Sequence, residues 1–264
     1  MTIRWPAETI WEQVEPLLPG FTVEVLPQID STNTELMRRA RAGQTEPILL
    51  VAERQTAGRG RLGRDWHSDT QAGAATLTFS LGLLLRLADW SGLSLAVGLA
   101  VVESLHPSLQ LKWPNDVWLQ ERKLAGILIE TTSIGDVRYA VIGIGINILP
   151  RAAEGLRTAP AALTEVMPQV DAPTALGAVV LPLVRTLQAF EASGFAPLRT
   201  AFHGRDLLYG REVICTDGTT GTARGVDAVG ALLVHTASGL QKISSAEVSV
   251  RPQTPADPPN GSSA

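Results

Sequence analysis

The chain has 264 residues, of which 45% are hydrophobic and 18% are charged, and its formal net charge is −4. This composition is typical of a soluble globular protein, either one large domain or a large domain with a small appendage. The negative charge argues against a general nucleic-acid-binding surface, because such a surface needs clustered Lys and Arg. The single cysteine, Cys215, excludes an internal disulfide and a Cys-rich metal site. We expect a cytoplasmic protein with no membrane partner, because a signal core is lacking and the apolar stretches 77–87 and 93–102 are short.

The first 28 residues are interpreted as a segment of their own. Apolar residues recur at helical spacing from Ile10 to Leu18, which predicts a short helix that ends at Pro19-Gly20 and packs on the following domain. The segment is too short for a helix-turn-helix, so we expect no DNA-binding domain ahead of residue 29 and no DNA partner.

The sequence that begins at Asp30, Asp-Ser-Thr-Asn-Thr-Glu, predicts the start of a helix. Thr32 and Glu35 have the spacing of a capping box. A plain helix N-terminus is one interpretation of this stretch. The other is that hydroxyls, an amide and free backbone N–H groups bind a polar ligand at Ser31, Thr32 and Asn33.

The stretch from Gln55 to Trp66 alternates glycine with arginine directly after a predicted strand, Ile48–Ala52. Glycine lets a backbone pass close to a ligand, and arginine offers a planar fork of donors for carboxylate or phosphate. We therefore expect the loop to close over an anion and to be mobile without one, although a solvated basic loop is the alternative. It is not a P-loop, because the terminal Gly-Lys-Ser/Thr is missing.

The middle of the chain predicts strands joined by short turns, which makes them antiparallel neighbours. Pro114 interrupts one of them and forbids a ladder hydrogen bond there, so that strand lies at an edge or carries a bulge. The glycine pair Gly143 and Gly145 indicates close approach of a ligand or of another backbone. The predicted elements are strand 76–81, a helix capped by Ser91 and ending before Pro107, the interrupted strand 109–119, and strands 123–130 and 139–148.

The last third of the chain begins with a long connection rich in Pro and Ala, residues 149–173, and continues with two predicted helices. From Leu207 onward, short strands alternate with glycine turns, which favours a small β-barrel. The Pro-, Ser- and Gly-rich tail is predicted to be disordered. The predicted helices are 175–191 and 197–205, and the predicted strands are 211–215, 220–224, 232–236 and 242–249.

Four spaced motifs together resemble the biotin–protein ligase family. They are Ser-Thr-Asn-Thr at 31–34, Gln-Thr-Ala-Gly-Arg-Gly-Arg-Leu-Gly-Arg at 55–64, Lys-Trp-Pro-Asn-Asp at 112–116 and Lys-Leu-Ala-Gly-Ile-Leu-Ile-Glu at 123–130. Each motif is weak alone, but the four in this order are specific, and the resemblance runs from about residue 28 to Arg251.

The resemblance implies an α+β fold. Its catalytic domain would be a mixed or antiparallel sheet flanked by helices, related to class II aminoacyl-tRNA synthetases, and a small SH3-like β-barrel would follow. The implied parts are a short N-terminal helical segment (1–28), a catalytic domain (29–206), the SH3-like domain (207–251) and a disordered tail (252–264).

The resemblance also implies site residues. Lys123, Arg61 and Asp116 would be catalytic, with Lys123 meeting the biotin carboxylate and later the phosphoryl oxygens. Asp116 would orient or deprotonate the acceptor amine, or else have a structural role beside Lys112. Implied biotin-binding residues are Ser31, Thr32, Asn33, Gln55, Arg59, Gly60, Arg61, Lys123 and Gly126. Implied ATP- or adenylate-binding residues are Arg59, Arg61, Arg64, Lys112, Asn115, Asp116, Asn147 and Arg251.

The implied function is a two-step, monofunctional biotin–protein ligase. Biotin and ATP would form biotinyl-5′-AMP and pyrophosphate, and the biotinyl group would then pass to a lysine of a biotin carboxyl carrier protein. Mg²⁺ is expected through the ATP phosphates, with no metal ligand assigned to the protein. The residue of the 149–173 connection that would cover the adenine stays open.

Two alternatives stay open at this point. One is a lipoate–protein ligase on the same fold, which the polar residues Ser31, Thr32, Asn33 and Gln55 disfavour. The other is a non-catalytic, biotin-responsive regulator, which the retained charged residues disfavour. A strand edge near 112–116 or the small barrel could contact the carrier or a second copy, so a homodimer also stays open.

Overall fold

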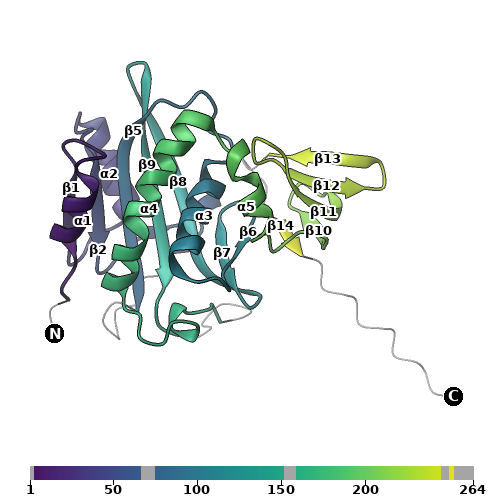
Figure 1. Ribbon diagram of the computed structural model, residues 1–264, viewed down its shortest axis with the longest axis horizontal. Helices are drawn as coiled ribbons and strands as arrows, with labels where there is room; N and C mark the ends of the chain where they lie inside the picture. Colours follow the sequence, from purple (N-terminus) through teal and green to yellow (C-terminus); the bar gives the residue numbers. More distant parts are fainter. Residues whose placement is uncertain (1–2, 67–74, 152–158, 245–249, 253–264) are drawn as a thin grey trace.

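A seven-stranded mixed sheet with the strand order β1-β2-β5-β9-β8-β7-β6 forms the body of the molecule (Figure 1). The computed structural model describes residues 3–66, 75–151, 159–244 and 250–252. Only the pair β1 and β2 is parallel, and the other neighbours in this sheet are antiparallel. The strands are β1 (Thr22–Leu26), β2 (Ile48–Ala52), β5 (Thr76–Leu85), β6 (Gln110–Lys112), β7 (Asp116–Leu119), β8 (Arg122–Ile134) and β9 (Val137–Asn147).

Helices cover both faces of this sheet, so the predicted sheet flanked by helices is confirmed. On one face lie α1 (Ala7–Val14), α3 (Leu93–Leu105) and α4 (Ala172–Ser193), and on the other lies α2 (Thr32–Arg41). Successive strand residues point to opposite faces. Leu49 and Val51 of β2 therefore join the core under α4, while Leu50 packs against α2.

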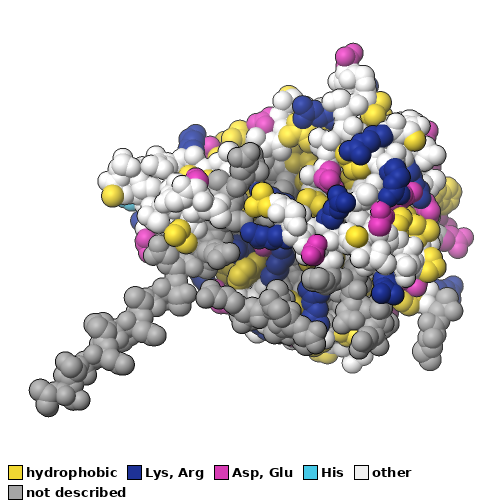
Figure 2. All heavy atoms as spheres, turned by 180° about the vertical axis from the view of Figure 1, so that it is seen from behind, with side chains coloured by type: hydrophobic (Ala, Val, Ile, Leu, Met, Phe, Trp, Pro, Cys, Tyr) yellow, Lys and Arg dark blue, Asp and Glu magenta, His cyan; other side chains and the backbone are white. Residues whose placement is uncertain are grey.

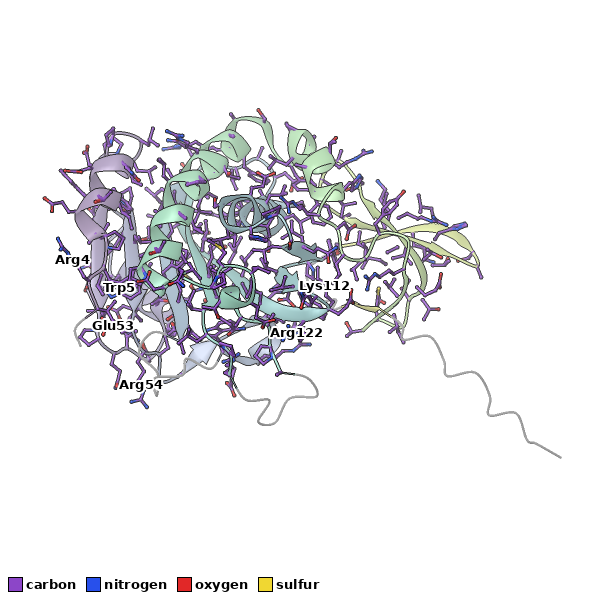
Figure 3. All side chains as sticks on the ribbon, turned by 60° about the horizontal axis from the view of Figure 1, so that its bottom comes forward. Arg4, Trp5, Glu53, Arg54, Lys112 and Arg122 are labelled. Atoms are coloured by element: carbon purple, nitrogen blue, oxygen red, sulfur yellow. The ribbon has the colours of Figure 1, made fainter. Side chains whose placement is uncertain are left out.

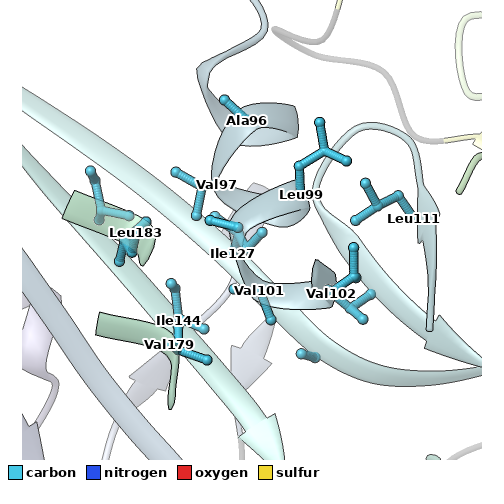
Figure 4. Packing of buried hydrophobic residues seen from close by; sticks show 14 of the residues in the cluster. Ala96, Val97, Leu99, Val101, Val102, Leu111, Ile127, Ile144, Val179 and Leu183 are labelled. Atoms are coloured by element: carbon cyan, nitrogen blue, oxygen red, sulfur yellow. The ribbon is translucent and has the colours of Figure 1, made fainter. Parts of the chain in front are cut away.

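The larger core is aliphatic and nearly closed to solvent. Figure 4 shows how α3 packs against the sheet and against its neighbour α4, with Val97 and Val101 close to Ile127, Ile144 and Leu183. Because α3 is covered on several sides, most of its residues are buried. By length and composition α4 could cross a membrane, but its apolar side is part of this core, as in a core helix of a globular domain.

The start of α3 differs from the prediction. Ser91 is not the cap; the cap position is Gly92, which has a φ of 77° and lies in the left-handed region. A Cβ atom at Gly92 would lie 2.7 Å from the side chain of Phe195. Glycine is therefore required at this position for two reasons, its left-handed backbone conformation and the close packing of Phe195.

The N-terminal segment contributes more than the predicted helix. Its residues Thr22–Leu26 form β1, which pairs with β2 from Thr22↔Ile48 to Leu26↔Ala52. The start of the segment is also attached to the residue after β2, because the indole N–H of Trp5 donates to Glu53 Oε1 at 3.0 Å (Figure 3). A strand at the sheet edge was missed because Val23 and Val25 alone give a weak alternating pattern.

The C-terminal part is a five-stranded antiparallel sheet with the order β13-β12-β11-β10-β14, which confirms the predicted small β domain. One predicted strand, 242–249, is wrong in its bounds. The chain forms β13 earlier and β14 later, residues 245–249 lie outside the described residues, and so does the tail from 253. The strands are β10 (Glu212–Cys215), β11 (Thr220–Val226), β12 (Leu232–Thr236), β13 (Gly239–Ile243) and β14 (Val250–Pro252).

Several contacts join this small domain to the catalytic sheet, among them the ion pair of Arg211 with Glu121 in the turn between β7 and β8. The indole N–H of Trp113, in the turn between β6 and β7, donates to the Gly230 carbonyl at 3.1 Å. Leu111 of β6 receives the chain that leads into the domain, because its N–H donates to Arg205 and its carbonyl accepts from Leu207. The prediction of a single interrupted strand over 109–119 is wrong, because β6 and β7 pair as an antiparallel hairpin with Pro114 in its turn. The predicted edge position is confirmed, since β6 is the last strand of the sheet.

Asp206 gives this junction a pH dependence. Burial raises the pKa of its carboxyl from the ordinary 3.8 to about 6, although Oδ1 accepts the Leu208 N–H at 2.9 Å. The folded protein therefore keeps a proton on Asp206 that the unfolded chain has lost over this range. Stability from the neutral carboxyl is present at low pH and is lost as the pH rises through about 6.

We predict that Asp206→Asn, whose side chain cannot ionise, does not lose stability in this way as the pH rises. Between about pH 4 and about pH 7, wild type should lose roughly 1–3 kcal/mol more unfolding free energy than the variant. Urea denaturation at a series of pH values measures the difference. Asp136→Asn, in the exposed turn between β8 and β9, is the control and should follow wild type. Parallel pH profiles for wild type and Asp206→Asn would contradict the assignment.

Candidate functional site

The N-terminus of α2 and Gln55 form one buried polar unit. The backbone N–H and the hydroxyl of Thr32 both lie within hydrogen-bond distance of Gln55 Oε1, at 2.7 Å and 3.1 Å. The backbone N–H of Thr34 donates to Ser31 Oγ at 3.4 Å. The backbone N–H of Ser31 donates to Asp30 Oδ1 at 2.8 Å, so the expectation of free backbone N–H groups is wrong for Ser31 and Thr32. What this turn can offer a ligand is its side chains.

The predicted capping box is wrong by one residue. The N-cap is Ser31, with extended backbone angles, so the third helical position is Thr34 and not a glutamate. Glu35 instead accepts from Arg39 Nε at 2.8 Å. The displacement follows from tertiary contacts, because the side chain of Thr32 is turned inward to Gln55.

Glycines on β8 and β9 form the floor under this unit. Gly126 pairs with Gly145, and Gly143 lies two residues earlier on β9. A Cβ atom at Gly143 would collide with the amide of Asn33, and one at Gly145 would collide with the indole of Trp66. The glycine pair was predicted to admit a ligand or another backbone, but the groups that approach it in the structure are the side chains of Asn33 and Trp66.

A small cavity of about 50 Å³ lies between the α2 N-terminus, the glycine floor and the loop after β2. Apart from Arg61, it brings together the residues predicted to bind biotin: Ser31, Thr32, Asn33, Gln55, Arg59, Gly60, Lys123 and Gly126. Sequence reasoning missed several other lining residues, among them Trp66, Thr78, Phe79 and Leu128. The Thr-Leu-Thr-Phe alternation of β5 was the signal for Thr78, because an alternating strand must present polar residues to one face.

The glycine–arginine loop is folded as a short hairpin. β3 (Gly58–Arg59) pairs with β4 (Asp65–Trp66), and the turn between them contains Leu62 with a φ of 58°. Trp66 covers the cavity, and the guanidinium carbon of Arg151 lies 5.7 Å from its ring centroid. The indole N–H of Trp66 has no hydrogen-bond partner within the described ranges. Mobility of this hairpin without ligand stays a prediction.

Charged groups lie at the mouth of the cavity. Lys123 Nζ is 2.7 Å from Asp116 Oδ1. Arg61 Nη1 donates to Asn115 Oδ1 at 3.4 Å, and the Asn115 amide donates to the Ile127 carbonyl at 2.8 Å. Burial lowers the pKa of the Arg61 guanidinium, and the nearby charge of Asp116 opposes that shift. The carboxylate of Asp116 thus has two cations near it, so an anionic ligand could compete for either.

The remaining residues of the predicted ATP set are less tightly grouped. Lys112 Nζ lies 4.6 Å from the ring centroid of Trp118, although Lys112 is paired in register with Asp116. Figure 3 shows Lys112 on the side of the sheet that faces the C-terminal domain. Arg64 is exposed in the turn of the hairpin. The backbone of Arg251 is described in β14, but its side chain lies outside the described residues.

Asn147 is the residue of this set with an unused polar atom. Its side chain is 1% exposed and its amide N–H lies 3.5 Å from the Lys123 carbonyl. Its Oδ1 has no partner in the part of the chain that the structure describes. The described part of the chain contains no cluster of three or more His, Cys, Asp or Glu side chains that could hold a metal ion.

A second cavity, of about 290 Å³, lies beside the free edge of β8. β7 pairs with β8 only from Arg122 to Gly126, so β8 extends beyond its neighbour. The groove is bordered by Ile129 and Thr131 of β8, Arg138 of β9, the start of α3, the Trp113-Pro114 turn and Gly230. Figure 2 shows the opposite side, the face that carries α2, where Lys and Arg side chains gather with acidic side chains among them.

A mixed sheet with a polar pocket under a glycine–arginine hairpin, cations at its mouth and a small β domain after it defines a ligase of the biotin or lipoate type. The profile of the Biotin/lipoate A/B protein ligase family matches residues 25–147, and that of the Biotin protein ligase C terminal domain matches residues 209–251. The fold and the order of the two domains agree with these matches.

Individual relatives narrow the class. The chain is 36% identical over 255 residues to the Bifunctional ligase/repressor BirA of Escherichia coli, covering 91% of this chain and 77% of that relative. It is 34% identical over 244 residues to the Biotin--[acetyl-CoA-carboxylase] ligase of Paracoccus denitrificans, covering 85% and 98%. The structure of the biotin protein ligase from Aquifex aeolicus in complex with biotin and ATP superposes with a TM-score of 0.75 at 31% identity, covering 88% and 99%. The chain belongs to the biotin protein ligase family and is a ligase enzyme.

Proposed function

We propose that the protein joins biotin and ATP into biotinyl-5′-AMP and then transfers the biotinyl group to a lysine of a biotin carboxyl carrier domain. The observation that carries this proposal is the polar pocket between Thr32, Gln55 and the glycine floor, with Lys123 at its mouth. A buried pocket lined by hydroxyl and amide groups suits a ureido head group, whereas a dithiolane would need an apolar slot. This contrast is why lipoate is the less favoured substrate.

The pocket must open to admit a ligand. Its volume of about 50 Å³ is far below the roughly 300 Å³ at which small-molecule sites begin. The movable part is the hairpin that carries Trp66, because the glycine floor is held by the paired strands β8 and β9. Closure of the hairpin over the adenylate would exclude water from a reactive mixed anhydride.

In the first step, the biotin carboxylate attacks the α-phosphorus of ATP, and pyrophosphate leaves. Two anions must approach each other, so the positive charges of Arg61 and Lys123 lower the barrier by positioning and electrostatic stabilisation. Mg²⁺ bound to the phosphates would neutralise further charge. If such a metal ion also took a ligand from the protein, the buried, unpartnered Oδ1 of Asn147 would be a suitable oxygen.

In the second step, the carrier amine must lose a proton to attack the carbonyl of the adenylate. Lys123 holds Asp116 in the free protein, at 2.7 Å. When an anionic ligand engages Lys123, the Asp116 carboxylate becomes available to accept or orient the amine proton. AMP then leaves with the electron pair of the broken bond.

The groove beside β8 is where we place the carrier. A strand edge that extends beyond its neighbour offers backbone groups for an added strand. Arg61 and Arg138 border the groove, which favours an acidic segment of the carrier, and Arg138 is held with its guanidinium 5.7 Å from the ring centroid of Trp90. The groove also borders Arg61, which contacts Asn115, so a bound carrier would lie next to the mouth of the pocket.

We predict that pyrophosphate is released from ATP with biotin and not with lipoate, and that biotin label then appears on a biotin carrier domain. A pyrophosphate assay and a label-transfer gel measure the two steps separately. ATP turnover with lipoate but not biotin would make the protein a lipoate ligase. Biotin binding without any turnover would make it a regulator.

We predict that Arg61→Gly still forms the adenylate but releases it. Loss of a charge-assisted hydrogen bond should speed biotinyl-AMP dissociation by about 10- to 100-fold. Pre-formed, labelled adenylate chased with unlabelled adenylate gives the rate. Arg54→Gly, at an exposed arginine outside the hairpin, is the matched control. An unchanged dissociation rate would rule out the closing role of this arginine.

We predict that Arg138→Glu raises the KM for an acidic carrier domain by about tenfold, because it reverses one charge at the groove. Pyrophosphate release with biotin and ATP alone should stay at the wild-type rate. Arg185→Glu, an exposed arginine on α4, makes the same charge change away from the groove. Equal carrier KM values for the two variants would place the carrier elsewhere.

A further inference from the structure

The polar unit at the pocket contains a residue that the motifs do not include. Ser80 lies in the middle of β5 with 0% of its surface exposed, and its Oγ is 2.7 Å from Thr32 Oγ1 and 2.6 Å from Asn33 Oδ1. A hydroxyl owns a single proton, so it can donate to only one of these two oxygens. The number of protons that the groups of the unit can supply decides which oxygen accepts the Ser80 proton.

Asn33 fixes the first assignment. Its Nδ2 lies 2.9 Å from Glu130 Oε2 and 3.2 Å from the Leu128 carbonyl. Both neighbours are acceptors, so the amide nitrogen must face them and both of its protons are used. Its Oδ1 therefore faces Ser80, and the proton between these two oxygens comes from Ser80.

The second assignment follows from the first. The Thr32 hydroxyl has one proton and two oxygen neighbours, Ser80 Oγ at 2.7 Å and Gln55 Oε1 at 3.1 Å. Because Ser80 has given its proton to Asn33, we assign the Thr32 proton to the shorter of these contacts, the one with Ser80. Gln55 is oriented independently, since its Oε1 accepts the Thr32 backbone N–H at 2.7 Å. The longer distance of 3.1 Å between the Thr32 hydroxyl and Gln55 Oε1 is then a contact without a proton. Thr32 is left with an unused lone pair, and Gln55 keeps its two amide protons.

We propose that Ser80, Asn33 and Glu130 are positioning residues that set the hydrogen-bond polarity of the biotin pocket. Glu130 orients Asn33, Asn33 orients Ser80, and Ser80 turns the Thr32 proton away from the pocket. Thr32 then acts as an acceptor for a ligand N–H, while Gln55 Nε2 acts as a donor. Asn33 acts through its neighbours and does not itself bind the ligand. This inference rests on the proposed function.

The polarity matches one class of ligand. A ureido head group has N–H donors and a carbonyl acceptor, so it needs a pocket that offers both acceptors and donors in a fixed arrangement. A hydroxyl that is free to rotate could offer either, and the site would lose discrimination. A chain of hydrogen bonds anchored on a carboxylate removes that freedom because each donor is committed.

Gly143 is part of the same arrangement. A Cβ atom there would collide with Asn33 Oδ1, so glycine at this position lets Asn33 reach across β9 to Ser80. The strand neighbours agree with this, because Ser80 of β5 is paired in register with Gly143 of β9.

The test uses the full chain and five variants, one of which is a control. Ser80→Ala removes the link, Thr32→Val removes the acceptor, and the double variant combines them. Glu130→Ala removes the anchor at a partly exposed position, where truncation leaves the buried strand intact. Thr76→Val is the control: it lies on the same strand and face, and its buried hydroxyl has no partner within the described residues.

Biotin affinity by calorimetry, KM values from pyrophosphate release and thermal midpoints are measured for each. We expect Ser80→Ala and Glu130→Ala to weaken biotin binding and raise its KM by about 5- to 10-fold. The KM for ATP and kcat should not change, and Thr76→Val should match wild type. The double variant should bind biotin no more weakly than Thr32→Val alone, because Ser80 acts through Thr32.

The outcomes separate the inference from the proposed function. Wild type that binds no biotin would overturn the proposed function. Wild type that binds biotin while Ser80→Ala or Glu130→Ala stays within twofold of it would overturn the inference alone. Additive losses in the double variant would also overturn it, because the two residues would then act separately. If Ser80→Ala fails to fold, Glu130→Ala tests the same chain of hydrogen bonds.

Discussion

The structure depends on one constraint, which is that a polar unit is buried between α2 and the sheet. A buried hydroxyl or amide without a partner costs about 1–3 kcal/mol, so each group in the unit must find one. Thr32, Ser80, Asn33 and Gln55 satisfy one another across three separate elements. That mutual satisfaction holds the first turn of α2 against β5 and β9 in a single arrangement. A pocket with a fixed pattern of donors and acceptors is the consequence.

The glycines of the floor serve the same constraint. They let the amide of Asn33 and the ring of Trp66 approach the strands more closely than any side chain would permit. The groups of the buried polar unit are uncharged hydrogen-bonding groups, whereas the groups at the mouth of the pocket are charged. Lys123, Asp116 and Arg61 lie there, where a carboxylate and phosphates would meet. The small β domain lies next to this mouth through the contact of Trp113 with Gly230, at a turn that also carries Asn115.

Sequence reasoning reached most of the site because its residues lie in compact motifs. Gln55, Arg59 and Lys123 are each flanked by glycines or by alternating apolar residues, and such patterns are local. It failed where the deciding partner is far along the chain. Ser31 replaces Thr32 as the cap because the Thr32 side chain is turned inward, to Ser80 and Gln55. Gly92 replaces Ser91 at the start of α3 because Phe195 occupies the space of a side chain. The strand β1 exists because β2 offers it a partner.

The sequence by itself predicted antiparallel strand pairs and a small C-terminal β domain, and its motifs, through the family they resemble, implied the class of fold and part of the pocket lining. These properties depend on periodicity, turn residues and motif spacing, which one chain carries along its length. Only the tertiary structure decided which face each polar side chain meets and which proton each hydroxyl gives away. Ser80 is the example, because a serine in an apolar strand has no local signal of its partners. Its two contacts, with Thr32 and Asn33, join residues more than 40 positions apart. Long-range contacts of this kind form only when the sheet and α2 have packed together, so no local pattern can encode them.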